Sequence, residues 1–253
     1  MRLSFVVPAY NEEAYVAACL ESILTQTREL PPELSALTEI IVVDNASTDG
    51  TREVALRYPG VIVVDEPRKG LTYARQAGFA ASSGSLIAHV DADSRLTPGW
   101  VSTVLESFDA EPQLAALSGP ILYYDLTPWQ RILVHVFYLT AFATYVLNRY
   151  VLRVGSMVQG GNFVTSRIAL EAIGGFNLGI AFYGEDTDIA RRLSTVGGVR
   201  FTFRLKMFSS ARRLKKEGIL TMALRYSINY FWTTFFKRPY TDNYIDIREQ
   251  PEG

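Results

Sequence analysis

LIAHVDAD, residues 86–93, joins a mostly apolar run to two carboxylates, Asp91 and Asp93, at its end. A run without polar alternation is typical of a strand that is covered on both faces of a parallel sheet. Four further runs rich in Val, Ile and Leu have this character; they lie at residues 3–7, 39–43, 61–64 and 114–118. The first half of the chain therefore predicts a series of buried strands.

Helical patterns fill the intervals between these strands, at residues 13–25, 51–58, 71–81 and 99–110. This alternation predicts an α/β fold with a mainly parallel central sheet, flanking helices and right-handed crossovers. Ligands of such sheets bind beyond the carboxyl ends of the strands. We therefore expect the functional residues directly after each strand.

The regular alternation stops near residue 120. The later predicted elements are an apolar helix at 129–151, a tight loop at 160–163 that enters a strand, a helix at 185–193, two strand-like pieces within 199–209 and an aromatic helix at 219–236. No Gly/Ser-rich linker divides the chain. We expect one domain over residues 1–217, followed by an aromatic and basic helix and tail over 218–253.

The composition bounds the class of protein. Of 253 residues, 48% are apolar, 25 are basic and 26 acidic, which suits a globular domain and excludes a disordered chain. The lone Cys19 allows no internal disulfide, and no Cys/His cluster has zinc-ligand spacing. His89 and His135 both lie in apolar segments and are expected to pack in the core. The apolar run at 3–7 is too short for a signal peptide, so we expect a mature chain that starts here and a cytoplasmic protein.

Residues 200–238 carry ten lysines and arginines against a single acid, Glu217. Such a segment suits anionic lipid, a phosphorylated ligand or nucleic acid, and a solvated helix face is the plain alternative. Aromatic residues interleave these charges, and we do not expect a nucleic-acid partner.

The apolar helix predicted at 129–151 contains sixteen residues, 132–147, without a formal charge except on a protonated His135. This length falls short of the roughly 20 residues that cross a bilayer. A crossing helix would also separate the carboxylates at 91–93 from those at 185–188. We expect this helix to be buried, to face a partner or to lie on a membrane surface.

Polar motifs follow the first two strands. PAYNE at 8–12 places a strand-ending Pro8 before Tyr10, whose ring offers a stacking face, and VDNASTDGT at 43–51 places Asp44 and Asn45 at a strand tip. A turn before a capped helix explains the first motif equally well. Capping does not explain Asp44 and Asn45.

Asp91 and Asp93 project to the same side of an extended segment, an arrangement that is costly unless a cation fills the spot. Hard oxygen ligands of this kind suit Mg²⁺ or Mn²⁺, whose remaining positions go to water and substrate phosphates. The position after a buried strand favours a metal-bound diphosphate over a plain surface loop.

Glu185 and Asp186 begin the predicted helix at 185–193. Carboxylates are electrostatically favourable at a helix N-terminus, so capping is one interpretation and a general base is the other. The sequence contains no Gly-x-Gly-x-x-Gly after a strand, no Walker A motif and no Gly-x-Ser-x-Gly. A classical dinucleotide site is therefore not supported.

Six short motifs, taken in order, closely resemble those of family 2 glycosyltransferases; they lie at 8–12, 43–51, 91–93, 160–162, 174–176 and 185–186. The resemblance spans about residues 3–215. It implies the GT-A fold, a nucleotide-diphosphate sugar as donor, a divalent metal and inversion of the anomeric centre. It also implies a nucleotide-sugar-binding half at 1–120 and an acceptor and catalytic half at 121–217.

The resemblance implies a role at each matching position. The donor would contact Pro8, Ala9, Tyr10, Glu12, Asp44, Asn45, Lys69, Gly70, Asp91, Ala92 and Asp93. Apart from the resemblance, Arg212 and Arg213 are expected beside the diphosphate, because a guanidinium suits phosphate geometry. Asp93 and Asp91 would ligate the metal, Asp186 would be the catalytic base with Glu185 as its neighbour, and Gly161 and Asn162 would lie on the acceptor side. Two departures from the family pattern are Asn45, where many members carry Asp, and the absence of a histidine near Arg212.

The implied reaction is a single displacement from a UDP-, GDP- or dTDP-sugar to an acceptor hydroxyl, of which a lipid-linked or cell-surface glycan precursor is one candidate. Two alternatives stay open: a non-catalytic carbohydrate-binding protein on this fold, and a sugar-phosphate nucleotidylyltransferase, which would be expected to carry a glycine-rich first loop in place of residues 8–12. The helix at 219–236 suits peripheral contact with the inner face of a membrane, or a second copy in a homo-oligomer.

Overall fold

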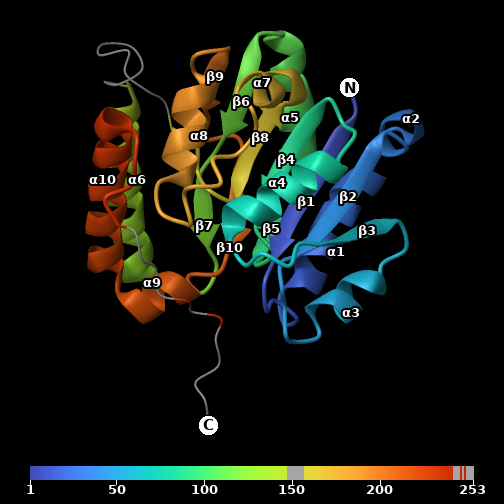
Figure 1. Cartoon of the computed structure of the whole chain (residues 1–253), viewed down its shortest axis with the longest axis horizontal. Helices are drawn as coiled ribbons and strands as arrows, with labels where there is room; N and C mark the ends of the chain where they lie inside the picture. Colours follow the sequence, from blue (N-terminus) through green and yellow to red (C-terminus); the bar gives the residue numbers. More distant parts are fainter. Residues whose placement is uncertain (147–156, 242–245, 247, 249–253) are drawn as a thin grey trace.

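The computed structural model describes residues 1–146, 157–241, 246 and 248, and within them a seven-stranded sheet forms the centre of the molecule (Figure 1). The strands lie in the order β3 (Val61–Asp65), β2 (Thr38–Asp44), β1 (Leu3–Ala9), β4 (Leu86–Val90), β8 (Asn162–Ser166), β6 (Leu114–Ser118) and β9 (Gly198–Phe201). Only β8 runs against its neighbours in this sheet. The predicted α/β class and mainly parallel sheet are confirmed.

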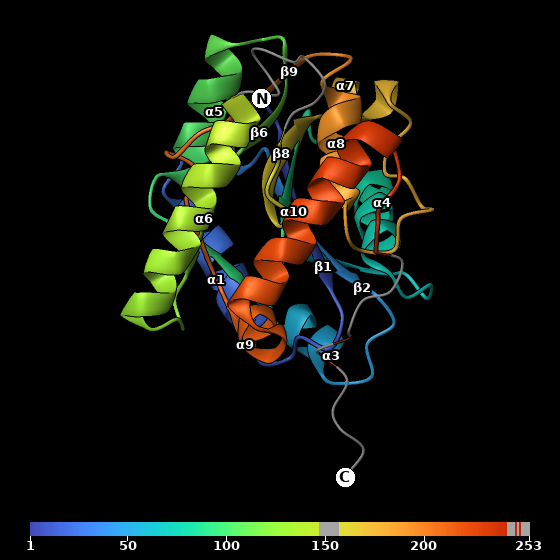
Figure 2. The same cartoon turned by 90° about the vertical axis from the view of Figure 1, so that its left-hand side faces the viewer.

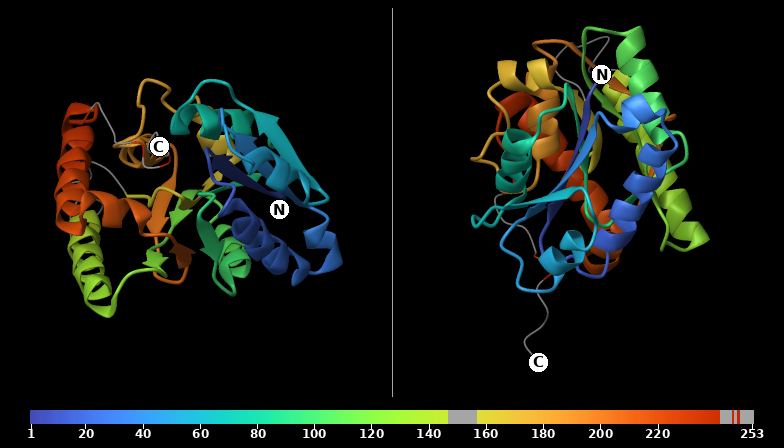
Figure 3. Two further views of the ribbon diagram at one scale, coloured as in Figure 1. Left: turned by 90° about the horizontal axis from the view of Figure 1, so that it is seen from below. Right: turned by 90° about the vertical axis from the view of Figure 1, so that its right-hand side faces the viewer.

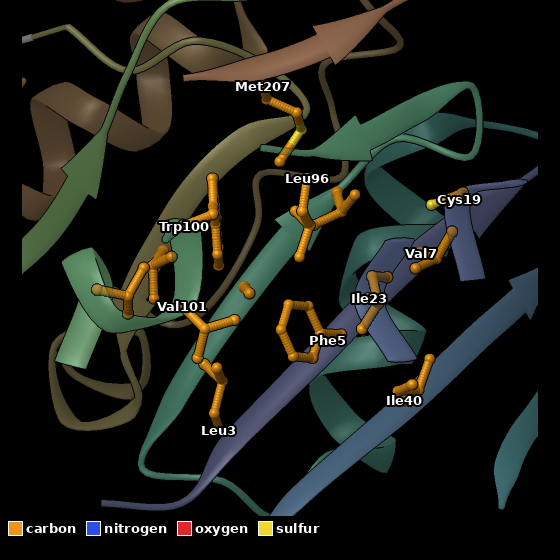
Figure 4. Packing of buried hydrophobic residues seen from close by; sticks show 14 of the residues in the cluster. Leu3, Phe5, Val7, Cys19, Ile23, Ile40, Leu96, Trp100, Val101 and Met207 are labelled. Atoms are coloured by element: carbon orange, nitrogen blue, oxygen red, sulfur yellow. The ribbon is translucent and has the colours of Figure 1, made fainter. Parts of the chain in front are cut away.

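Helices cover both faces of the sheet because successive side chains of each strand point to opposite sides. One face packs against α1 (Val16–Arg28), α3 (Thr51–Leu56) and α5 (Trp100–Ala110), and the other against α4 (Leu71–Ala81), α7 (Arg167–Ala172) and α8 (Glu185–Leu193). The hydrophobic cluster between the sheet and α1, α3 and α5 is called the first core, and Figure 4 shows that Phe5 of β1 packs there between Ile23 of α1 and Trp100 of α5. The short α2 (Pro32–Ser35) leads into β2.

A second sheet of three short strands lies beyond the carboxyl end of β4. It has the order β5 (Ser94–Leu96), β10 (Met207–Ser209) and β7 (Ile121–Tyr123). The sequence predicts a strand only near β10, because three-residue strands are too short to show a periodic pattern. Ser209 ends β10, and α9 (Arg212–Glu217) follows it, so this sheet brings the basic segment to Asp93.

Two long helices, α6 (Pro128–Val146) and α10 (Ile219–Phe236), lie side by side at one end of the molecule, away from the central sheet (Figures 1 and 2). Seen from below, the pair stands apart from the central sheet (Figure 3, left). Of α6, only Val134 and Tyr145 are buried. Residues 147–151 of the predicted helix lie outside the described residues. Within the described part of the chain, no helix has both the length and the apolar character to cross a bilayer.

The two histidines have different surroundings. His89 is buried and stacks on Phe163 with ring centroids 4.4 Å apart, as predicted for a core residue. His135 is exposed, so the prediction that it packs in the core is wrong. The reason is that α6 turns only one narrow stripe toward the rest of the protein.

Candidate functional site

A cavity of about 600 Å³ lies beyond the carboxyl ends of β1 and β4 and extends to α6 and α10. Its volume is in the range of small-molecule pockets. Most of the predicted site residues line it: Pro8, Ala9, Tyr10, Asn45, Lys69, Gly70, Asp91, Asp93, Glu185, Asp186, Arg212 and Arg213. The sheet topology thus brings together side chains that are far apart in the sequence.

Asp93 is held by groups from the second sheet and α9. Ser209 Oγ donates to Asp93 Oδ1 at 3.2 Å, and Arg212 Nη2 lies 3.1 Å from Asp93 Oδ2. Arg212 also pairs with the buried Glu12. Burial raises the pKa of Asp93, the charge of Arg212 opposes this rise, and the charge of Asp91 adds to it. The carboxylate pair therefore forms a negative spot beside an arginine.

The pair formed by Asp91 and Asp93 fits a divalent cation that is shared with a substrate. Among the described residues, no group of three or more acidic, histidine or cysteine side chains could hold a metal ion by itself. Mg²⁺ bound to a nucleotide takes only one or two carboxylates from the protein and completes its shell with phosphate oxygens and water. Both carboxylates line the cavity, and burial, together with the neighbouring charge of Asp91, raises the pKa of Asp93. These two residues would hold the metal.

Lys69 lies over the ring of Tyr10, with its ammonium 4.2 Å from the ring centroid and 2.9 Å from the phenol oxygen. The loop that carries Lys69 is fixed by Asn45. Asn45 Nδ2 donates to the carbonyl oxygens of Glu66 at 3.0 Å and Arg68 at 2.8 Å, and its Oδ1 accepts from the Gly70 amide at 2.8 Å. Asn45 therefore shapes the wall of the cavity through the backbone of this loop.

Two residues of the C-terminal tail also reach this region. Asp246 Oδ2 lies 2.7 Å from Lys69 Nζ, and Arg248 Nε donates to Glu12 Oε1 at 2.6 Å. The other carboxylate oxygen of Glu12, Oε2, is buried without a hydrogen-bond partner. Burial raises the pKa of Glu12, while Arg248 and Arg212 oppose this rise. Neither tail residue is predicted from the sequence, because the tail shows only a polar composition.

Glu185 and Asp186 stand at the first turn of α8, across the cavity from the strand ends. Glu185 is buried and pairs with Arg75, and its Oε2 has no hydrogen-bond partner. Burial raises the pKa of Glu185 to about 7 against the opposing charge of Arg75. Asp186 is partly exposed, and its Oδ1 accepts from the Thr187 amide at 2.8 Å. Burial also raises the pKa of Asp186, which makes its carboxylate a better base.

Arg75 is a site residue that the sequence analysis missed. Arg75 is fully buried on α4 and forms an ion pair with Glu185. Its Nη2 lies 3.3 Å from Asp91 Oδ1, and its guanidinium carbon lies 5.3 Å from the centroid of the Phe163 ring. It thus connects the carboxylate of the strand end to that of α8. One sequence signal points to Arg75: it lies four residues before Phe79 and beside Ala74, and so falls on the apolar face of the predicted helix.

Five predicted residues do not line the cavity: Glu12, Asp44, Ala92, Gly161 and Asn162. Ala92 packs in the first core, and Asp44 Oδ1 accepts from the Ser47 amide at 3.2 Å in the turn after β2. The Asn162 side chain is buried, accepts from Trp100 Nε1 at 3.0 Å and donates to the Leu205 carbonyl at 2.8 Å. The Asn162 side chain therefore ties β8 to α5 and to the loop before β10, and it does not line the cavity.

Gly161 contributes through its backbone. Its φ is +78°, and a Cβ atom there would lie 2.2 Å from Asp91 Oδ2. Only glycine adopts this conformation easily while allowing the carboxylate so close. Gly161 therefore supports the position of Asp91.

Comparison with known proteins gives consistent results. The family model described as "Glycosyl transferase family 2" matches residues 4–174. Glycosyltransferase AglE of Haloferax volcanii is 31% identical over 104 residues, which are 39% of this chain and 33% of AglE. The chain spans between 14% and 33% of the length of the first three curated relatives.

Solved structures support the fold. The mannosyltransferase PcManGT from Pyrobaculum calidifontis, in complex with GDP-Man and Mn²⁺, is similar with a TM-score of 0.68 and 21% identity, over 93% of this chain and 63% of that one. Glucosyl-3-phosphoglycerate synthase from Mycobacterium tuberculosis, in complex with Mn²⁺, UDP and phosphoglyceric acid, has a TM-score of 0.61 and 21% identity, over 92% and 78% of the two chains. The predicted GT-A fold is confirmed.

Proposed function

Because the chain belongs to glycosyl transferase family 2, we propose that it moves a sugar from a nucleotide-diphosphate sugar to an acceptor hydroxyl, with inversion at the anomeric carbon. One observation carries this proposal: Asp91 and Asp93 share a single cavity with Glu185 and Asp186, although almost a hundred residues separate the two pairs in the sequence. A transferase of this type needs a site for the diphosphate opposite a base for the acceptor.

In the proposed reaction Asp186 accepts the proton of the acceptor hydroxyl. The hydroxyl oxygen forms a bond to the anomeric carbon as the bond from this carbon to the diphosphate oxygen breaks. A divalent cation on Asp93 and Asp91 supplies positive charge beside the leaving diphosphate when it is bound. Arg212, next to Asp93, and Arg213 add positive charge near the same groups. Glu185, paired with Arg75, positions the base.

The donor side of the cavity supports a nucleoside on Tyr10 and the loop fixed by Asn45, near Lys69 and Gly70. The similar structures contain GDP-Man in one case and UDP in the other. We propose a UDP-, GDP- or dTDP-sugar as donor and Mg²⁺ or Mn²⁺ as the metal. The proposed acceptor is lipid-linked, with the protein bound peripherally to a membrane surface.

The test is a panel of nucleotide sugars incubated with the protein and Mn²⁺, with release of nucleoside diphosphate as the measurement. At least one donor is expected to be hydrolysed slowly without acceptor, and EDTA is expected to stop this release because the leaving diphosphate loses its cation. Metal-independent release, or no release from any donor, would contradict the proposal. The second result would favour a non-catalytic carbohydrate-binding protein.

With the donor known, Asp186→Asn is expected to lower the rate of transfer to an acceptor by about 10² to 10⁴, the usual contribution of a general base. Donor binding, measured by calorimetry, should stay within a few-fold. The control is Glu171→Gln, whose exposed carboxylate pairs with Arg167 away from the cavity lining. A folded Asp186→Asn protein with normal turnover would exclude Asp186 as the base.

A further inference from the structure

The cavity continues from the candidate catalytic carboxylates into a groove between α6 and α10. Phe137 and Ala141 of α6 line one wall, and Ala223 and Tyr226 of α10 line the other. Phe182 and Tyr183, which precede Glu185 and Asp186, join the groove to the reactive end. One continuous space therefore has a charged end and an apolar end.

Most side chains that α6 and α10 contribute to the lining are apolar or aromatic, and Thr140, Thr144, Ser227 and Asn229 add uncharged polar groups. Among the described residues that line the cavity, none that comes from α6 or α10 is acidic or basic. The α6 helix is apolar, yet only two of its side chains are buried. Exposed apolar side chains that gather in a groove usually mark a site that binds a ligand or a partner.

The arrangement favours one kind of occupant. The reactive end, with Asp93, Asp186 and Arg213, requires a polar head group, whereas the uncharged groove requires a hydrocarbon chain. A water-soluble sugar would leave the groove unfilled, and a charged peptide would lose its solvation there without gaining a partner. An amphiphile with its polar head at Asp186 satisfies both ends.

We propose that the groove between α6 and α10 is the acceptor site and that it binds the hydrocarbon chain of a lipid-linked acceptor, whose hydroxyl then reaches Asp186. This inference rests on the proposed transferase function, because the groove serves an acceptor only if Asp186 acts on one. Ala141 and Ala223, on opposite walls, leave the space through which the chain passes.

The experiment measures binding by calorimetry with two probes, octyl glucoside below its critical micelle concentration and methyl glucoside. Both probes have the same hydroxyl groups and differ in chain length. Octyl glucoside is expected to bind at least about tenfold more tightly, since the burial of about two methylene groups gives such a ratio. No donor or metal is needed, so this result is independent of the donor-hydrolysis test.

Two matched variants locate the probe. Ala141→Trp fills the groove and is expected to remove the advantage of the octyl chain. Ala143→Trp adds the same side chain two residues away, at an exposed position that does not line the cavity, and is expected to preserve it. Ala223→Phe on the opposite wall serves as a second groove-filling variant if Ala141→Trp does not fold.

Equal affinity for the two glucosides would overturn the proposal. So would an octyl advantage that survives in folded Ala141→Trp and Ala223→Phe, because the chain would then bind elsewhere. If octyl glucoside binds in the groove but no nucleotide sugar is hydrolysed, the groove is a lipid site and the transferase function fails. If a donor is hydrolysed but the two glucosides bind equally, the transferase function stands and its acceptor is not a lipid.

Discussion

Arg75 determines how the negative charges of the site are arranged. It is the only arginine among the largest fully buried side chains of the described residues, and it pairs with Glu185 while lying 3.3 Å from Asp91. A buried cation between two carboxylates fixes both of them and offsets their repulsion. Removal of its charge would leave both carboxylates uncompensated.

We expect Arg75→Gln to lower the free energy of unfolding by about 3 to 5 kcal/mol, as found when one partner of a buried ion pair is removed. Denaturant unfolding measures this loss. The control is Arg68→Gln, whose side chain is 62% exposed and pairs with Glu66, so that its loss should lower the stability far less than Arg75→Gln does. Equal stability of the Arg75→Gln variant and the wild type would show that the pair contributes nothing.

Glu185 makes stability depend on pH. Because its pKa is raised from 4.5 to about 7 in the folded state, the folded protein holds a proton that the unfolded chain releases between these values. The contribution of Glu185 to the free energy of unfolding is therefore fully present below pH 4.5, and it is lost as the pH rises through 7. Thermal unfolding at pH 5 and pH 8 should show a smaller fall in Tm for Glu185→Gln than for the wild type.

The exposed Glu171 provides the control for this prediction, because its side chain is 57% exposed and pairs only at the surface, with Arg167. In the Glu171→Gln variant, Tm should fall between pH 5 and pH 8 by as much as it does in the wild type. An identical fall in Glu185→Gln would mean that Glu185 is ionised at pH 5 in the folded protein.

The sequence predicts most of the residues of the site because they follow strands whose carboxyl ends meet at one edge of the sheet. It does not predict Arg75 or the tail contacts of Arg248, since both depend on tertiary packing. The resemblance to family 2 glycosyltransferases implies that Asn162 lies on the acceptor side. The pattern cannot show whether such a side chain points into the cavity or, as here, hydrogen-bonds with buried groups such as Trp100 and the Leu205 carbonyl.

The turn that enters β8 fixes the position of the Asp91 carboxylate through Gly161. Gly161→Ala is expected to displace the Asp91 carboxylate, because its new Cβ would lie 2.2 Å from Oδ2. Donor hydrolysis should then require at least about tenfold more Mn²⁺ for half-maximal rate, which corresponds to about 1.4 kcal/mol of lost binding. A titration of the rate with Mn²⁺ measures this change.

Gly174→Ala is the matched control. Its φ of +74° imposes the same backbone strain as at Gly161, of the order of 1 to 2 kcal/mol, but a Cβ there would meet no atom within 4 Å. Both variants should lose similar stability through strain, and only Gly161→Ala should change the Mn²⁺ requirement. The same Mn²⁺ requirement in both variants would exclude a role of Gly161 in placing Asp91.

The sequence predicts buried strands well from their apolar runs, whereas the start of a helix and the direction of a strand also depend on the path of the backbone. The five long apolar runs became β1, β2, β3, β4 and β6, and the aromatic helix covers 219–236 as predicted. The helix predicted from residue 13 begins at Val16, because Asn11 takes a left-handed conformation and residues 12–15 form a turn. The antiparallel direction of β8 has no signature in side-chain pattern, since it depends on the path of the preceding connection.

Beyond the cavity, α10 continues the apolar groove onto an exposed surface of the protein. Phe231, Phe235 and Phe236 are 48% to 60% exposed, and the exposed Lys237 and Arg238 follow them. Aromatic rings beside cations suit the interface of an anionic membrane. This surface is the basis for the proposed peripheral membrane contact.

We expect the protein to float with vesicles that contain anionic lipid and to be released by high salt, because the attraction of cations to the surface is screened. The double change Phe235→Ser and Phe236→Ser should weaken flotation. Leu56→Ser, at a 57% exposed position on α3, is the control and should not. Absence of flotation, together with a dimer in sedimentation that the double change dissociates, would favour the homo-oligomer instead.

The position of β8 between β4 and β6 has a consequence for synthesis on the ribosome. The strands β1 to β4 are complete once residue 90 has emerged, and they can assemble from neighbouring stretches of nascent chain. One edge of β4 then stays unpaired until residues 162–166 arrive. Truncated or stalled chains that stop in this interval would expose the unpaired, apolar edge strand β4, and they are the species in which we expect aggregation to begin.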